Sequence, residues 1–502
     1  MANRAHQRTH AGVPPLDHLT LRRRLSRDFM VYGLGEVAVK LFSLITVPVY
    51  TRLFDPAEYG TLSIVLTLNG LFMAFVILGG DSAYARFFFA ARTEDERQRI
   101  TSTWIGFLAA WSLFMVLVVL PFAPQIATWA LDGNADALLV VVPLLSVPIV
   151  IVNRMCAQVL RNEFRPAAYT ALNTVSVALT IAIGLIAAVG LGLGVLGILV
   201  GALGAEALML PARLWVARGM FRATFSPQLL RRLLAFGVPL VPISLAYWVF
   251  LVSDRLLLGR LSSLEQVGLY SVAASLVGVT SVAVAAFGQA WTPHAVRLFE
   301  DEPHRAPALF GRVLTYVLAG FGFLCVGIST LAPELIDILT GAGFEPAAAA
   351  VPPLALAMVA YASTHVTAAG ITLRLRTQYL AGHAWLAAIV NVGLNLVLIP
   401  TFGMLGAAWA TTVAYSVLTA AYLVTSQRLW PVRYEVGRSL TIVTVILAMT
   451  VGGVLIPELP VLTSILVKGA YCALFPIALF ALRAFDQRER HALAAVGRVI
   501  RR

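Results

Sequence analysis

The chain has 502 residues, of which 59% are apolar and only 12% are charged. Soluble domains carry roughly 25% charged residues, so this composition excludes an ordinary soluble protein and indicates a membrane protein. The net charge of +12 is explained by membrane topology and by attraction to anionic inner-leaflet lipids, so we expect no nucleic-acid partner. The three cysteines lie far apart in apolar runs, which predicts neither a disulfide nor a metal site.

Long apolar stretches follow one another along the whole chain. A helix needs about 20 apolar residues to cross a hydrocarbon core of roughly 30 Å. About fourteen stretches meet this requirement, and they begin near Met30, Gly60, Ile100, Leu138, Ala167, Gly194, Leu234, Val267, Phe310, Ala347, Tyr379, Met404, Leu440 and Val461. The sequence therefore predicts an all-α integral membrane protein with about fourteen transmembrane helices.

Lysine and arginine gather in alternate gaps between these stretches. In short loops such residues mark the cytoplasmic side of the membrane. The tails before Met30 and after Arg483 are basic, whereas the opposite helix ends hold only Arg52, Arg255 and Arg260. We therefore expect a multi-pass membrane protein with both termini in the cytoplasm.

The chain also repeats itself. The segment 33–63 is echoed about 205 residues later by the segment 237–271. Asn173, followed by Gly-Val-Leu-Gly at 194–197, is echoed by Asn391, followed by Gly-Met-Leu-Gly at 403–406. Each unit holds about six helices, and an even number makes both units enter the membrane in the same direction. Such parallel repeats occur in transporters that bind their substrate between two lobes.

Six segments follow from the repeat and the charge pattern. They are a basic cytoplasmic tail (1–28), an N-terminal lobe (29–217), a basic linker (218–234), a C-terminal lobe (235–427), a helix pair outside the repeat (428–485) and a basic cytoplasmic tail (486–502). In the linker, Ser226 followed by Pro227 is a helix start signal. The helix that begins there is either a short one along the inner interface or a continuation of the seventh transmembrane helix.

Three spaced motifs carry a family resemblance. The first is VYTRLFDPAEYG at 49–60, the second is the stretch 229–276 with FGVP at 236–239 and VGLYS at 267–271, and the third begins with NVGLN at 391–395. In this order they resemble the Wzx-type polysaccharide-biosynthesis flippases of the multidrug/oligosaccharidyl-lipid/polysaccharide (MOP) exporter superfamily. The resemblance implies two six-helix lobes around a central cavity, alternating access, and a polyprenyl-diphosphate-linked oligosaccharide as cargo. It also implies a location in the bacterial plasma (inner) membrane.

Ionisable residues inside the predicted helices are the candidates for function, because placing one charged side chain in the middle of a bilayer costs at least about 2.5–3.5 kcal/mol. Glu36 and Lys40 lie one turn apart and form either a structural ion pair or a proton- or cation-responsive element. Arg154 either extends to the inner interface or faces the cavity and binds the diphosphate. Glu206 lies near the middle of the sixth helix and either faces the cavity or pairs with Arg154 or Lys40.

Two repeat-related arginines, Arg52 and Arg255, lie at outer helix ends, where they form either local structural contacts or a basic rim around the outer mouth. Asp254 is expected to pair locally with Arg255 or to take part in this site. Asp81 and Arg86, near the inner end of the second helix, are weaker candidates that we expect at the membrane interface.

The remaining candidates lie in the second half of the chain. His365 is either a hydrogen-bonded packing residue or a group that titrates near neutral pH. Asn391 and Asn395 share one helix face, which favours bridges between helices over contact with cargo. Lys468 is expected to extend to the outer interface.

The expected function is transport without covalent chemistry, with no bound cofactor and with a proton or sodium gradient as the driving force. The alternatives are a lipid II flippase and a cation-coupled drug antiporter of the same superfamily. A membrane enzyme is disfavoured because no outer connection is long enough for a catalytic domain. Expected partners are membrane lipids, the lipid-linked glycan, and the polymerase and chain-length proteins of a polysaccharide pathway.

Overall fold

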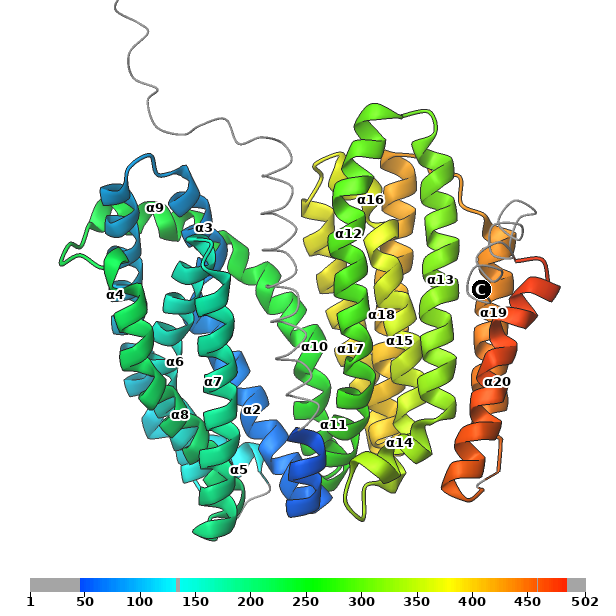
Figure 1. Ribbon diagram of the computed structural model, residues 1–502, viewed down its shortest axis with the longest axis horizontal. Coiled ribbons are helices and arrows are strands. Elements are labelled where there is room, and N and C mark those ends of the chain that lie inside the picture. The colour runs from blue at the N-terminus through cyan, green and yellow to red at the C-terminus, as the bar shows by residue number, and fades with distance from the viewer. Residues whose placement is uncertain (1–45, 132–135, 458, 485–502) are drawn as a thin grey trace, which may run out of the picture.

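The computed structural model describes residues 46–131, 136–457 and 459–484, and the regular structure in these segments is helical (Figure 1). Within them, twelve helical spans are long and apolar enough to cross a membrane. The helix expected near Met30 lies outside the described residues, and the seventh expected helix corresponds to α10 (Val241–Leu261), which is not among the twelve. The all-α membrane fold is therefore confirmed, and the count of about fourteen stays a prediction.

The N-terminal lobe follows a short helical segment at 46–53. Its elements are α2 (Pro56–Ile77), α3 (Gly80–Ala90), α4 (Glu94–Val119), η1 (Leu120–Phe122), α5 (Ala123–Ala130), α6 (Leu138–Asn162), α7 (Pro166–Leu185), the π-helical turn η2 (Ile186–Gly190), α8 (Gly194–Ala217) and η3 (Arg218–Met220). The linker forms α9 (Pro227–Gly237) and η4 (Val238–Leu240).

The C-terminal lobe comprises α10 and the elements that follow it. These are α11 (Leu264–Gly278), α12 (Thr280–Asp301), α13 (Ala306–Thr330), α14 (Ala332–Leu339), η5 (Glu345–Ala350), α15 (Val351–Thr367), α16 (Ala369–Leu373), α17 (Gln378–Phe402) and α18 (Met404–Leu429). The last pair, α19 (Val436–Val454) and α20 (Val461–Ala481), packs against α13 at the far side of this lobe (Figure 1).

Local signals in the sequence explain several helix starts. Asp55 accepts a hydrogen bond from the Glu58 amide at 2.8 Å, and the Glu58 side chain returns one to Asp55, which forms a capping box before α2. Thr93 and Glu96 form the same motif before α4. The linker start signal is confirmed, because the Ser226 hydroxyl accepts from the backbone of the first turn of α9.

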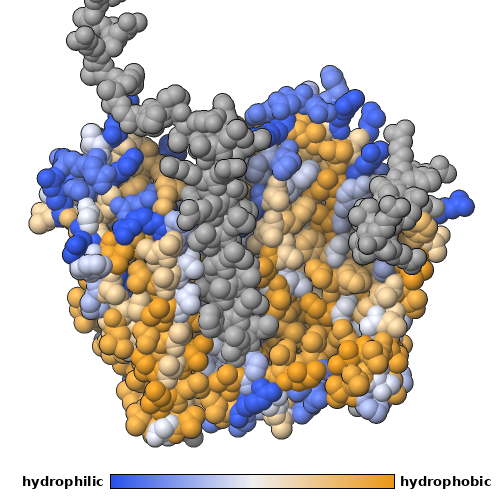
Figure 2. Space-filling model, viewed as in Figure 1, coloured by the Kyte–Doolittle hydropathy of each residue, from blue (hydrophilic) through white to orange (hydrophobic). Residues whose placement is uncertain are grey.

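The helix α9 lies across one end of the N-terminal lobe and continues through η4 into α10 without a non-helical residue (Figure 1). The Arg86 guanidinium lies 4.8 Å from the ring of Phe236 in α9, and Arg222 pairs with Asp95 of α4. Hydrophilic residues concentrate at the two ends of the lobes and leave an apolar band between them (Figure 2). The linker helix thus shows features of both alternatives, because it lies across the hydrophilic end of the lobe and is also continuous with α10.

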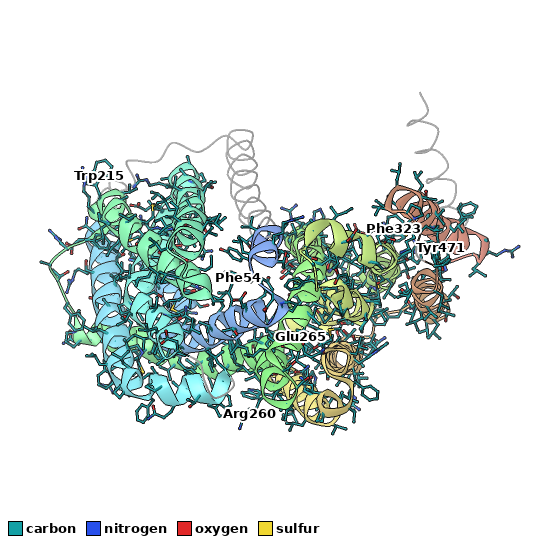
Figure 3. All side chains as sticks on the ribbon, turned by 90° about the horizontal axis from the view of Figure 1, so that it is seen from below. Phe54, Trp215, Arg260, Glu265, Phe323 and Tyr471 are labelled. Carbon is teal, nitrogen blue, oxygen red and sulfur yellow. The ribbon has the colours of Figure 1, made fainter. Side chains whose placement is uncertain are left out.

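The two lobes meet where repeat-related segments of α2 and α11 cross, at the end that the charge pattern places outside. A Cβ atom on Gly60 would lie 1.8 Å from the Leu264 carbonyl oxygen, and one on Gly268 would lie 1.9 Å from the Pro56 carbonyl oxygen. One turn further, the Ser63 and Ser271 hydroxyls are 2.7 Å apart. Figure 3 looks onto this end of the molecule. Only glycine permits this contact, which holds the outer ends of the lobes together.

Candidate functional site

A polar cavity of about 410 Å³ lies inside the N-terminal lobe. Helices α3, α6, α7 and α8 line it with the residues Asp81, Val150, Asn153, Arg154, Ala157, Gln158, Arg161, Tyr169, Asn173, Glu206 and Arg213. Three arginines face two carboxylates, so the lining carries a net positive charge within an otherwise apolar helix bundle. The structure thus brings together three predicted residues, Asp81, Arg154 and Glu206.

Arg154 forms an ion pair with Asp81, whose carboxylate lies 2.5 Å from a guanidinium nitrogen. The two side chains are 49% and 31% exposed, so the pair lies at the cavity mouth and stays accessible. A break between α2 and α3 positions Asp81, because Leu78 and Gly79 adopt φ angles of 52° and 66°. Asp81, which we expected at the interface, therefore lines the cavity.

The interior of the cavity is built around Glu206. The Asn153 amide donates to the Glu206 carboxylate at 2.6 Å, and Ser176 donates to its other oxygen at 3.3 Å. Arg213 is only 6% exposed and donates to the Asn153 carbonyl oxygen at 3.2 Å. Among the contacts of the described residues, Arg154 therefore pairs with Asp81, and Glu206 is held by neutral side chains.

Sequence reasoning missed Arg213 as a site residue, because its position suggested the basic inner loop. A signal was available, since Arg213 and Glu206 lie seven residues apart and so share one face of α8. Asn153 and Gln158 are 1% and 8% exposed. They were missed because an uncharged amide costs less to bury than a charged group and is therefore less conspicuous in an apolar sequence.

The C-terminal lobe contains a second polar centre, which is closed. Asp254 is 3% exposed and accepts hydrogen bonds from the Tyr270 hydroxyl, from Thr411 at 3.4 Å and from the Arg255 amide at 2.9 Å. Asn391 continues this network, with its amide nitrogen 3.4 Å from the Thr411 hydroxyl. The centre thus joins α10, α11, α17 and α18.

Asn391 and Asn395 are both fully buried within this network. The Asn391 side-chain oxygen accepts from Ser253 of α10 at 3.1 Å and from Asn395 at 3.1 Å. The expected bridging role of Asn391 is confirmed, because its partners Ser253 and Thr411 lie on other helices. The structure also unites Asp254 with the two asparagines, although about 140 residues separate them in the chain.

Each of the two repeat-related arginines contacts another helix. Arg52 donates to the carbonyl oxygens of Pro48 and Ile338, both at 2.9 Å, and so binds the C-terminal end of α14. The Arg255 guanidinium lies 5.8 Å from the centre of the Tyr270 ring. The basic rim around an outer mouth remains a prediction.

Three further candidates differ in their outcome. The His365 ring packs beside Phe287 and Tyr361, with ring centres 6.3 and 5.9 Å away, and directly against Gly288. This is the packing role, although the His365 Nε2 atom is buried without a hydrogen-bond partner in the described part of the chain. Glu36 and Lys40 lie outside the described residues.

The expectation that Lys468 extends to the interface is wrong. Its side chain is 2% exposed, and its ammonium lies 2.5 Å from the Glu334 carboxylate in α14. Ser464 donates to the same carboxylate oxygen. Tertiary packing supplies an acidic partner that no local pattern in α20 revealed, and a buried partner removes the need to reach water.

This pair gives a testable pH dependence. Burial alone would raise the pKa of Glu334, but hydrogen bonds from Lys468 and Ser464 hold the pKa below its ordinary value of 4.5. Because the folded pKa is depressed, the stabilisation is present above pH of about 4.5 and is lost as the pH falls through the folded value. We expect Lys468→Met to lower thermal stability in detergent at pH 7 and to flatten its decrease toward pH 3. A parallel decrease in both proteins would contradict this role.

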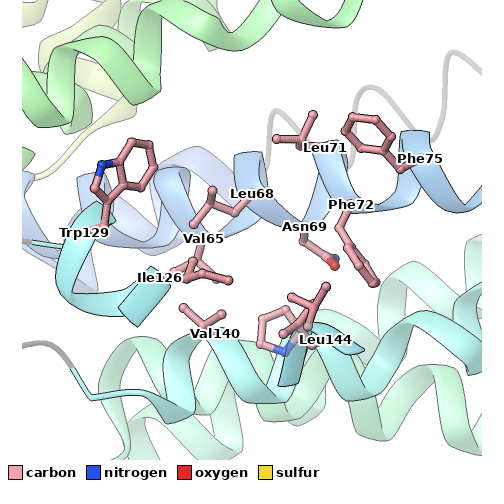
Figure 4. Close-up of a pocket in the computed structure, with 12 residues that line it drawn as sticks. Val65, Leu68, Asn69, Leu71, Phe72, Phe75, Ile126, Trp129, Val140 and Leu144 are labelled. Carbon is pink, nitrogen blue, oxygen red and sulfur yellow. The ribbon is translucent and has the colours of Figure 1, made fainter. Parts of the chain in front are cut away.

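A separate apolar pocket of about 250 Å³ lies between α2, α5 and α6 (Figure 4). Its lining is almost entirely aliphatic and aromatic, and Asn69 supplies the polar side chain that points into it (Figure 4). Such a lining suits a lipid chain and not a charged head group. Among the described residues, no group of three or more His, Cys, Asp or Glu side chains is placed to hold a metal ion.

The fold matches those of solved membrane transporters. The lipid II flippase MurJ in an inward closed conformation superimposes with a TM-score of 0.72 at 14% identity, covering 89% of this chain and 98% of that one. An outward-facing multidrug resistance MATE transporter superimposes with a TM-score of 0.53 at 16% identity, covering 81% of this chain and 95% of that one. A MOP superfamily transporter from Pyrococcus furiosus superimposes with a TM-score of 0.53 at 16% identity, covering 81% of this chain and 94% of that one. Its binding pocket is described as having reverse polarity.

These similarities define the class, a multi-pass membrane protein with the fold of the MOP superfamily. The chain belongs to the polysaccharide biosynthesis protein family, whose model matches residues 25–299. No curated protein matches the sequence. The resemblance stated from the three motifs is thereby confirmed.

Proposed function

We propose that this protein is a flippase that moves a polyprenyl-diphosphate-linked oligosaccharide across the bacterial plasma membrane by alternating access. The observation that carries the proposal is the arginine-lined cavity inside an apolar lobe, in a chain of the polysaccharide biosynthesis family. The physical task is to shield a charged, hydrated head group from hydrocarbon, which a polar cavity accomplishes while the polyprenyl tail stays in lipid. Arg154 at the cavity mouth offers a planar guanidinium that suits a diphosphate.

The proposal includes a setting for this activity. Both termini lie in the cytoplasm, membrane lipids surround the apolar band, and the polymerase and chain-length proteins of the pathway receive the cargo on the outer side. No covalent step is required, so the protein acts as a transporter and not as an enzyme.

Reconstitution tests the function directly. Purified protein in liposomes that contain a fluorescent polyprenyl-diphosphate-linked oligosaccharide should make the inner-leaflet lipid accessible to a membrane-impermeant glycosidase added outside. Liposomes without protein, and liposomes with a fluorescent phospholipid of similar size, serve as controls. Equal exposure of the glycan lipid with and without the protein would contradict the proposal.

The superposition with MurJ favours lipid II as the second candidate cargo. Restored growth of cells depleted of their lipid II flippase would support that cargo over a polysaccharide unit. A cation-coupled drug antiporter is less compatible with the site, because a cationic drug would meet a cavity with a net positive charge. Drug resistance conferred on an exporter-deficient strain would favour the antiporter.

A proton or sodium gradient is proposed to drive the cycle, with Asp254 as the residue that responds to it. A buried carboxylate surrounded by hydroxyls and amides is a group whose cation or proton occupancy can differ between two conformations. We expect Asp254→Asn to keep the size and shape of the side chain, to remove its charge, and to abolish the stimulation of transport by an imposed ion gradient. Transport by the variant that still responds to the gradient would exclude Asp254. Glu265→Gln, at the start of α11, is the matched control.

A further inference from the structure

The N-terminal cavity has two zones of different character. At its mouth, Arg154 and Asp81 pair with each other and stay accessible. In its interior, Asn153 and Arg213 are 1% and 6% exposed. Each of these two buried side chains keeps one polar atom, Asn153 Oδ1 and Arg213 Nε, without a hydrogen-bond partner in the described part of the chain.

These two atoms have opposite requirements. The Asn153 side-chain oxygen needs a donor, and the Arg213 Nε–H needs an acceptor. A phosphate oxygen only accepts at neutral pH, and it would also face the Glu206 carboxylate, which repels it. A hydroxyl group both donates and accepts, so a molecule with neighbouring hydroxyls meets both needs and tolerates the carboxylate.

We propose that the interior of this cavity is a subsite for the hydroxyl groups of a sugar in the cargo glycan, while Arg154 at the mouth faces the diphosphate. This inference rests on the proposed function. The cavity volume of about 410 Å³ falls within the range of small-molecule sites and exceeds the space of a single water. Leaving buried polar atoms unpaired is costly, so a matching sugar gains affinity over a bare diphosphate lipid.

The test compares two lipids on the full-length protein in detergent. One is polyprenyl diphosphate without sugar, and the other is the lipid-linked oligosaccharide extracted from the cells that make this protein. We expect the wild type to bind the oligosaccharide lipid about tenfold more tightly than the bare diphosphate lipid. Asn153→Leu should remove this preference, which is measured as the ratio of the variant's affinities for the two lipids.

A second variant and a control keep the result interpretable. Arg213→Lys keeps the positive charge but loses the Nε–H and the planar fork, so it should also reduce the preference for the oligosaccharide lipid. Ser146→Ala, on the same helix α6, removes a hydroxyl that bonds only within its own helix in the described contacts, and it should bind both lipids as the wild type does. Unfolding temperatures without ligand confirm that each variant is folded.

The two proposals fail in different ways. Equal binding of both lipids by the wild type, or a parallel loss of both affinities in Asn153→Leu and Arg213→Lys, would overturn the sugar subsite. Absence of binding to either lipid, together with no transport by the wild type in liposomes, would overturn the proposed function itself.

Discussion

Arg154→Ala is expected to reduce transport of the lipid-linked oligosaccharide by about 10- to 100-fold while leaving membrane insertion intact. The variant removes the accessible guanidinium at the mouth of the cavity and leaves the Asp81 carboxylate, 31% exposed, without its partner. The unpaired carboxylate would then repel the diphosphate that the arginine is proposed to bind. Transport is measured in liposomes and by restoration of surface polysaccharide in a flippase-deficient strain.

Two further arginine variants sharpen this result. Arg154→Lys keeps the charge but not the planar fork and should give an intermediate rate. Arg305→Ala removes an arginine whose side chain is 86% exposed and should leave transport unchanged. Full restoration of surface polysaccharide by Arg154→Ala would exclude the cavity mouth as the head-group site.

The double variant Ser63→Cys and Ser271→Cys is expected to form a disulfide under oxidising conditions and to lose transport completely. Reduction of the disulfide should restore transport. The two hydroxyl oxygens are 2.7 Å apart, so cysteines at these positions lie within reach of a disulfide. The bond would tie α2 to α11 at the crossing of Gly60 and Gly268, and this contact must part if the two lobes separate at the outer end during alternating access. Transport is measured in liposomes before and after reduction, alongside the fraction of cross-linked protein.

Single cysteine variants control for the substitution itself. Ser63→Cys and Ser271→Cys should each transport at nearly the wild-type rate in both redox conditions. The native Cys156, Cys325 and Cys472 are buried and are not expected to compete for oxidation. Undiminished transport by fully cross-linked protein would show that the outer ends of the two lobes need not part.

The general architecture followed from the sequence with few errors. The expected starts at Leu138, Gly194, Met404 and Val461 coincide with the observed starts of α6, α8, α18 and α20. Boundaries of this kind are predictable because the length of an apolar run is set by the membrane. The breaks within the spans were harder to predict from the sequence, because the interruption at Leu78 and Gly79 depends on two backbone angles and not on hydropathy.

The candidate site was predicted in part. Single charges within helices, such as Arg154, Glu206 and Asp254, stood out because each is costly in a bilayer. Their partners stood out less. Asp81 was a weaker candidate expected at the interface, and Asn153 and Thr411, on other helices, carry no charge. Lys468 shows the same limit, since its partner Glu334 lies 134 residues away.

The sequence by itself determined the membrane environment, the class of fold, the repeat and the family, because hydrophobic length, charge placement and short motifs are local properties of the chain. Only the tertiary structure decided which charges face each other, that the cavity opens within the N-terminal lobe while the polar centre of the C-terminal lobe is closed, and that glycines join the lobes at one end. These features depend on how helices pack side by side, and the free energy of an ionic or polar contact is set by the neighbour across that interface.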